Sequence, residues 1–172
     1  KVTAETCPHY FAATDDLITG FDTNTKVNPP IREERDRVAI IEGLKDGTLD
    51  AIVTDHAPHH ANDKDVEYNL AAFGIIETSF AFAITYLYKA GALTLSEIAD
   101  KMSRNPSDIL NLGGGKIEAG GAADLTIADL NEEFVVDSAK FVSKGKNTPF
   151  NGRRLSGVVK YTLVDGDVKY KA

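Results

Sequence analysis

The pattern of apolar and polar residues predicts a strand, a helix and a second strand in the first third of the chain. Residues 2–6 alternate apolar and polar side chains, which is typical of a short strand. Residues 33–45 carry apolar side chains near helical spacing, and Gly47 is a typical helix end. Residues 50–54 form a short apolar run bounded by turn signals, which favours a buried parallel strand.

The middle of the chain predicts a loop followed by helices. Residues 61–69 are polar and indicate a loop, whereas residues 75–89 have the length and apolar content of a helix. A Thr followed three residues later by a Glu starts a further helix over residues 94–102 with a capping-box pattern. The Asn-Pro pair after it opens one more short helix, which the glycines at 113–115 close.

Beyond residue 115 the pattern changes to strands. Four runs have strand composition: residues 123–130, 134–136, 157–163 and 168–170. Asp165-Gly166 is a strong hairpin-turn signal between the last two. We therefore expect a strand–helix part over residues 1–112 and a β-rich part over residues 113–172.

Composition limits the class of protein. The 172 residues suffice for one domain or for the end of a larger one, and 42% hydrophobic residues fit a soluble globular protein. A net charge of −7 argues against nucleic-acid and anionic-membrane partners, and we expect neither. The single cysteine favours a reducing compartment, the cytoplasm. Because the chain starts inside a predicted strand, we interpret it as cut from a longer one.

A cluster of polar side chains follows the second predicted strand. Asp55, His56, His59 and His60 lie there within six residues. Strand, helix, strand and a polar cluster at the strand end are typical of (β/α) barrels, whose catalytic groups lie at the carboxyl ends of strands. A carboxylate at that position can bind a divalent metal and accept a proton from water. Spacing alone leaves open that Asp55 and its histidine neighbours only form structural hydrogen bonds.

Residues 54–59, with the sequence TDHAPH, resemble a motif of the dihydroorotases, amidohydrolases of the class I type. Further segments resemble the same family in the same order: residues 3–9, 27–32, 73–75, 105–106, 120–125, 147–157 and 164–166. The resemblance covers nearly the whole chain. It implies an α/β fold, the last two β/α units of a (β/α)8 TIM barrel followed by part of a small β-rich domain.

The resemblance also implies roles for individual residues. Asp55 would bind zinc, with one or two ions in each complete site, and would act as the general acid and base. His59 would hold the substrate carboxylate, while Asn28 and the backbone of Phe73 and Gly74 would hydrogen-bond the pyrimidine ring. The implied reaction is the reversible hydrolysis of dihydroorotate to N-carbamoyl-L-aspartate in pyrimidine biosynthesis.

Other candidate ligands receive lesser roles. We expect His9 to lie beside the metal without binding it, because the family's nearest metal-binding histidine lies upstream of this chain. His56 and His60 are expected at the surface or beside the site. Cys7 has no basic neighbour in sequence that would lower its pKa, so we do not expect a reactive thiol.

Most metal ligands of the family are absent from these residues, since no His-x-His pair occurs. We therefore predict that the chain alone is inactive and that the N-terminal part of the barrel or a companion chain completes it. A homo-oligomer is also expected. The segment at residues 73–78 is shorter than in the family, which leaves the contribution of Phe73 and Gly74 open. Two alternatives stand: an allantoinase or hydantoinase, or a non-catalytic subunit that assembles with aspartate transcarbamoylase.

Overall fold

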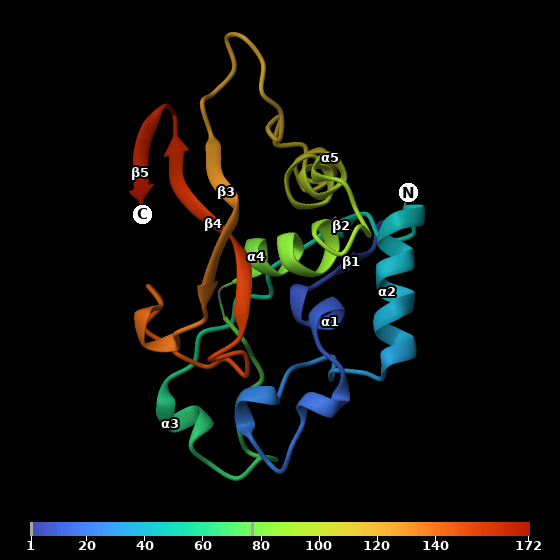
Figure 1. Cartoon of the computed structure of the whole chain (residues 1–172), viewed down its shortest axis with the longest axis vertical. Helices are drawn as coiled ribbons and strands as arrows, with labels where there is room; N and C mark the ends of the chain where they lie inside the picture. The colour runs from blue at the N-terminus through green and yellow to red at the C-terminus, as the bar shows by residue number, and fades with distance from the viewer. Residues whose placement is uncertain (1, 77) are drawn as a thin grey trace.

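The computed structural model describes residues 2–76 and 78–172, so that Lys1 and Glu77, which fall on predicted elements, lie outside the described residues. Figure 1 shows helices around a short pair of strands, with a larger sheet beside them. The first elements are β1 (Glu5–Thr6), α1 (Pro8–Ala12), η1 (Asp15–Leu17), η2 (Thr23–Thr25), α2 (Glu34–Asp46), β2 (Ala51–Ile52) and α3 (Ala61–Lys64). They are followed by α4 (Ser79–Ala83), η3 (Ile84–Tyr88), α5 (Leu95–Ala99), η4 (Asp100–Arg104) and α6 (Asn105–Ile109). The last are β3 (Leu125–Val135), η5 (Ser138–Lys140), β4 (Arg154–Val164) and β5 (Asp167–Lys171).

β1 and β2 pair in parallel, with Thr6 opposite Ile52, and α2 lies between them in the chain. The predicted strands are therefore confirmed in part, since β1 covers the last two residues of the first run and β2 covers two residues within the second. The predicted helix is confirmed as well, and Gly47 ends it in the left-handed conformation with φ of 86°. Parallel strands end at the same edge of a sheet, so the segments after Thr6 and after Ile52 emerge side by side.

Two short helices lie outside the predicted ones. Pro8 occupies the first turn of α1, where a missing N–H costs nothing. Residues 61–64 form α3 inside the predicted loop, with the His60 ring accepting a hydrogen bond from the amide of Asn62. Neither helix has the apolar periodicity that would reveal it in the sequence.

The predicted helix over residues 75–89 begins later than expected. Ile75 instead forms an isolated parallel bridge with His56, and Thr78, at φ of 67°, precedes the first turn. α4 then continues directly into the π-helical η3. The bridge holds Ile75 in strand-like pairing instead of a helix, which explains the later start.

The capping box at Thr94 and Glu97 is confirmed at the start of α5. The helix predicted to open separately at Asn105 is instead continuous with it, because η4 joins α5 to α6. The Asn105 N–H donates to the Asp100 carbonyl five residues back, in the wider π-helical register. Such a turn accommodates Pro106, which has no N–H to donate.

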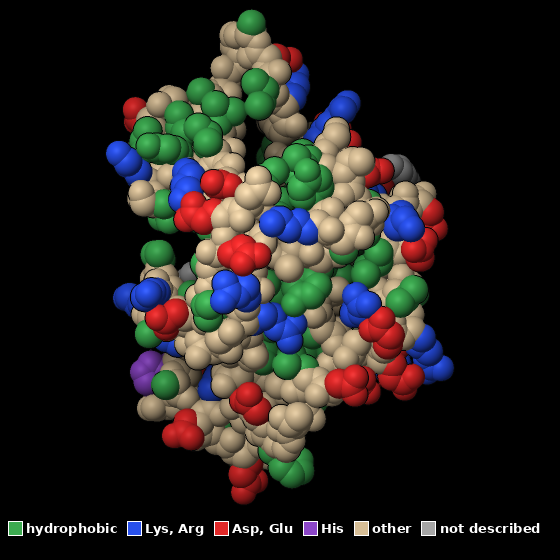
Figure 2. All heavy atoms as spheres, viewed as in Figure 1, with side chains coloured by type: hydrophobic (Ala, Val, Ile, Leu, Met, Phe, Trp, Pro, Cys, Tyr) green, Lys and Arg blue, Asp and Glu red, His purple; other side chains and the backbone are tan. Residues whose placement is uncertain are grey.

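β3, β4 and β5 form an antiparallel sheet in that order. The two runs predicted between residues 123 and 136 join into the single strand β3, whose register shifts between Asp129 and Glu133. The predicted hairpin turn is confirmed, since Asp165 and Gly166 both have positive φ, 51° and 80°. Figure 2 shows hydrophobic side chains gathered over the outer part of this sheet.

One hydrophobic cluster connects the helical part to the β-rich part. The rings of Phe82 and Phe150 meet edge to face, with centroids 4.6 Å apart. Leu155 on β4 is buried in the same cluster. A Cβ on Gly157 would lie 3.0 Å from Ile84, so glycine permits this close approach of β4 to η3. The segment around residues 147–157 is therefore fixed relative to the helices that surround β1 and β2.

Candidate active site

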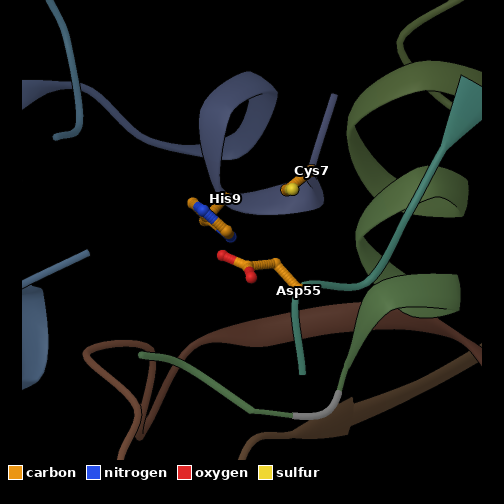
Figure 3. A group of neighbouring side chains, drawn as sticks. All are labelled: Cys7, His9 and Asp55. Atoms are coloured by element: carbon orange, nitrogen blue, oxygen red, sulfur yellow. The ribbon is translucent and has the colours of Figure 1, made fainter. Parts of the chain in front are cut away.

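Asp55 lies just beyond β2, where the chain turns with a positive φ of 49°. Cys7 and His9 lie just beyond β1 at the same edge of the parallel pair. Figure 3 shows the Asp55 carboxylate directed toward the His9 ring, with the Cys7 thiol beside them. The potential ligand atoms of the three side chains all lie within 4.8 Å of one another. We call these residues the strand-end cluster.

His9 is the most buried member of the strand-end cluster. It occupies the second position of α1, and only 2% of its surface is exposed. Its Nε2 atom is buried without a hydrogen-bond partner. Burial lowers the pKa of His9 from 6.5 to about 4, so the imidazole is neutral at neutral pH. A neutral imidazole offers a lone pair to a metal or an N–H to a carboxylate, according to its tautomer.

Cys7 has the opposite character to an activated thiol. Burial, followed by the negative charges of Asp55 and Glu5, raises the pKa of the Cys7 thiol to about 12. The thiol therefore stays protonated at neutral pH, as the sequence led us to expect, and is not prepared to act as a nucleophile.

Tyr10 connects the strand-end cluster to the neighbouring loop. Burial also raises the pKa of its phenol, so that the hydroxyl remains a donor. That hydroxyl donates a hydrogen bond of 2.6 Å to the Pro29 carbonyl. The segment that follows Asn28 is thereby tied to α1.

A divalent metal fits the strand-end cluster in part. The Asp55 carboxylate and a neutral imidazole are donors that zinc accepts. The unpartnered Nε2 of His9 shows that the described residues leave one buried polar atom beside the carboxylate to be satisfied. A catalytic zinc takes three protein ligands, which Asp55 alone does not provide. The cluster therefore fits an edge of a metal site whose other ligands come from elsewhere.

A second set of contacts surrounds His59. The His59 amide donates to Oδ1 of Asn147 at 3.1 Å, and Nδ2 of Asn147 donates to the carbonyls of Ala57 at 3.0 Å and Gly74 at 3.1 Å. We call Ala57, His59, Gly74 and Asn147 the Asn147 hydrogen-bond cluster. It brings the loop after Asp55 together with Gly74, as a shared site requires.

Phe73 is half-exposed, and its ring lies 4.6 Å from the Lys26 ammonium. The Gly74 N–H donates to the Lys26 carbonyl at 3.0 Å. The Gly74 N–H is therefore engaged within the chain, whereas its carbonyl retains a second lone pair beside the bond from Asn147. Asn28 lies exposed two residues after Lys26.

Two lysines that the sequence analysis did not single out anchor this region. Lys64 is buried, and its ammonium donates to the carbonyls of Thr23 at 2.9 Å and Ala72 at 2.8 Å. Burial, and then the nearby charge of Lys26, lower the pKa of Lys64. Lys26 in turn donates to the Ala71 carbonyl at 2.8 Å. A lysine in a polar stretch carries no sequence signal of such a role.

A cavity of about 760 Å³ opens beside His59. His59, His60 and Lys64 line it together with Lys144 and Lys146. Asp55 is not among its lining residues, so this cavity adjoins residues 58–61 and 143–147 rather than the strand-end cluster. Among the described residues, no helix is both long and apolar enough to cross a membrane.

Comparisons with known proteins agree on one family. A model of the amidohydrolase family matches residues 18–169. The dihydroorotase of Acetivibrio thermocellus is 59% identical over 170 residues, which make up 98% of this chain and 40% of the relative. That of Ruminiclostridium cellulolyticum is 58% identical over 96% of this chain and 39% of its own length. The structure of an L-hydantoinase from Arthrobacter aurescens superposes with a TM-score of 0.93 at 29% identity, over 99% of this chain and 39% of that one. The chain thus spans about 40% of the length of the relatives that it matches.

Proposed function

The chain belongs to the amidohydrolase family, and we propose that it supplies part of the active site of a dihydroorotase. Eight relatives named dihydroorotase are 47–59% identical to it over nearly its whole length. The hydantoinases with similar structures are 20–29% identical, which supports that alternative less well. The proposed reaction is the reversible hydrolysis of dihydroorotate to N-carbamoyl-L-aspartate, a cytoplasmic step of pyrimidine biosynthesis.

We propose that β1 and β2 are the last two strands of a TIM barrel. Their parallel pairing, and a strand-end cluster at their carboxyl ends, support this arrangement. Residues 1–112 would then belong to the barrel, and residues 113–172 to a small β-rich domain beside it. The antiparallel order of β3, β4 and β5 fits the second part.

The single observation that carries the proposal is the position of the Asp55 carboxylate, which is directed toward the buried His9 ring, whose Nε2 has no hydrogen-bond partner. Asp55 would hold the metal, and His9 would lie beside it. A bound zinc ion would lower the pKa of water and polarise a carbonyl group. Zinc, with one or two ions in the complete site, is our proposal from the donor set and the family.

Asp55 would also carry the proton through the reaction. Its carboxylate would accept a proton from the attacking water as that oxygen bonds to the ring carbonyl carbon. The carbon–nitrogen bond of the ring then breaks, and Asp55 returns the proton to the departing nitrogen. Water and one ring bond are consumed, and a carboxylic acid and a carbamoyl N–H are formed. At neutral pH the acid loses its proton to solvent and becomes a carboxylate, so no other reactant is needed.

His59 would bind the substrate carboxylate, because its imidazole lies on the loop after Asp55 and lines a cavity rich in cationic side chains. Asn28 and the backbone of Phe73 and Gly74 would hydrogen-bond the pyrimidine ring. Since the Gly74 N–H is engaged with Lys26, its carbonyl is the group of Gly74 that we propose for this contact. Lys26 and Lys64 would hold these segments together.

The remaining zinc ligands would come from protein outside these residues, either the preceding barrel strands or a companion chain. We therefore propose that the isolated chain neither holds a binuclear metal centre nor turns over dihydroorotate. The complete enzyme would be a homo-oligomer.

A chimera tests the proposal. In it, this chain replaces the matching 40% of the Acetivibrio thermocellus dihydroorotase, and the unmodified relative serves as the control. We expect the chimera to bind zinc and hydrolyse dihydroorotate, and the isolated chain to do neither. Faster hydrolysis of hydantoin or allantoin would favour a related cyclic amidase. A folded chimera without turnover, whose chain co-purifies with aspartate transcarbamoylase, would favour a non-catalytic subunit.

A further inference from the structure

Asn147 lies outside the loops to which substrate contacts were assigned, yet its side chain joins two of them. We propose that Asn147 is a positioning residue, which sets His59 and Gly74 at a fixed separation across the substrate site. This inference rests on the proposed function for His59 and Gly74. It extends that function to the segment at residues 145–147, to which the family resemblance gave no role.

The hydrogen bonds of Asn147 are the first line of support. A carboxamide has two N–H donors and a carbonyl acceptor, and here each kind is used. Nδ2 donates to the carbonyls of Ala57 and Gly74, while Oδ1 accepts from the His59 amide, with all three distances between 3.0 and 3.1 Å. Only 4% of Asn147 is exposed, so water does not readily replace these bonds.

Close packing of two glycines is the second line of support. A Cβ on Gly145 would lie 3.0 Å from both the backbone N and O of His59. A Cβ on Gly74 would lie 2.6 Å from the Ala57 oxygen and 2.9 Å from Cδ2 of the His59 ring. The backbone of His59 therefore has segment 145–147 against it, and its ring has Gly74 against it. The Asn147 side chain links these contacts.

The consequence is specific to substrate binding. The Asn147 side chain forms hydrogen bonds with the loop after Asp55, at the backbone of Ala57 and His59. It also donates to the carbonyl of Gly74, in the loop that contains Phe73. The bridge between His56 and Ile75 also joins these two loops, so loss of Asn147 would loosen the placement of His59 and Gly74 rather than separate the loops. Asp55 is positioned by other contacts, since it lies three residues after the end of β2 at Ile52 and next to His56, which bridges Ile75. The KM for dihydroorotate should therefore change more than kcat.

Kinetics of the chimera with Asn147→Ala test this. We expect the KM for dihydroorotate to rise about tenfold or more, with kcat changed less than about threefold. Asn151→Ala is the matched control, since its Oδ1 also accepts a backbone hydrogen bond, from Ser138 at 2.9 Å, and Ser138 is outside the Asn147 hydrogen-bond cluster. The milder Asn147→Ser should give the same split if Asn147→Ala does not fold. A fall in kcat as large as the rise in KM, or no change in either constant, would overturn the inference.

Hydrogen exchange of the His59 amide tests the inference without activity. In the isolated chain, Asn147→Ala should speed exchange at His59 about tenfold or more, while exchange within α2 stays unchanged. Unchanged exchange at His59 would overturn the positioning role. If the unmodified chimera has no turnover, the proposed function fails, and the exchange experiment still decides whether Asn147 fixes the loop.

Discussion

The strand-end cluster and the Asn147 hydrogen-bond cluster lie at the two ends of one short loop and differ in how completely the chain satisfies them. In the first, Nε2 of His9 is buried without a partner, and burial shifts the pKa values of His9 and Cys7 in opposite directions. In the second, the carboxamide of Asn147 bonds three backbone groups. We propose from this difference that the first cluster receives a group that the chain does not supply. In the second cluster, the hydrogen bonds of Asn147 hold the loop after Asp55 in place.

The largest effect should come from the acid of the strand-end cluster. Asp55→Asn in the chimera keeps the size of the side chain but removes its charge and its capacity to carry a proton. We expect kcat for dihydroorotate to fall on the order of a thousandfold or more. Steady-state kinetics measure it, and Asp63→Asn, at an exposed position on α3, is the control. A loss below tenfold would remove Asp55 from the chemistry.

The next largest effect is expected on the rate at which the Cys7 thiol is alkylated. With a pKa of about 12 instead of 9.0, the thiolate fraction is about a thousandfold smaller than in an ordinary thiol. Iodoacetamide at pH 8 should therefore label Cys7 far more slowly in the native chain than in urea. Asp55→Asn should speed the native reaction, because it removes a nearby negative charge. Equal rates in the native and unfolded chain would mean that the cluster is open to solvent.

His9 should make the stability of the chain depend on pH. Its pKa is about 4 in the folded chain and near 6.5 when unfolded, so between these values the unfolded state binds the proton and the folded state does not. The free energy of unfolding should therefore fall as the pH drops from 6.5 to 4, by up to about 3 kcal/mol. Urea unfolding at pH 7.5 and pH 4.5 measures it. His9→Gln should remove this part of the pH dependence, and an unchanged profile in that variant would contradict a buried neutral imidazole.

The smallest effect should come from replacing the His59 imidazole, which belongs to the Asn147 hydrogen-bond cluster. His59→Gln removes one hydrogen bond to the substrate carboxylate, so the KM for dihydroorotate should rise roughly tenfold with little change in kcat. His60→Asn is the control, since asparagine keeps an acceptor for the Asn62 amide at the start of α3. A larger rise in KM for His60→Asn than for His59→Gln would show that His59 is not the histidine that binds the substrate carboxylate.

Local sequence patterns predicted the parts of the molecule that depend on local physics. The existence of β2 and of a polar residue beyond it follow from a buried apolar run that stops before Asp55, although the strand itself ends earlier, at Ile52. The capping box at Thr94 and the turn at Asp165 likewise depend on a few neighbouring residues, and both are confirmed. The TDHAPH motif identified the family, which the comparisons support.

The parts that were missed depend on contacts between distant residues. The burial of His9 follows from the packing of α1, a helix of five residues too short to show a periodicity. Asn147 meets His59 across 88 residues, and no local pattern encodes that contact. The late start of α4 follows from the bridge between Ile75 and His56. In each case tertiary packing, rather than propensity, decides the local structure.

The most direct test of the central claim is a crystal structure of the chimera grown with zinc, with the metal located by its anomalous scattering. The account predicts a zinc ion about 2.0–2.2 Å from a carboxylate oxygen of Asp55, with the His9 ring beside it. Zinc bound only by other residues, or an Asp55 carboxylate turned away from the ion, would contradict it.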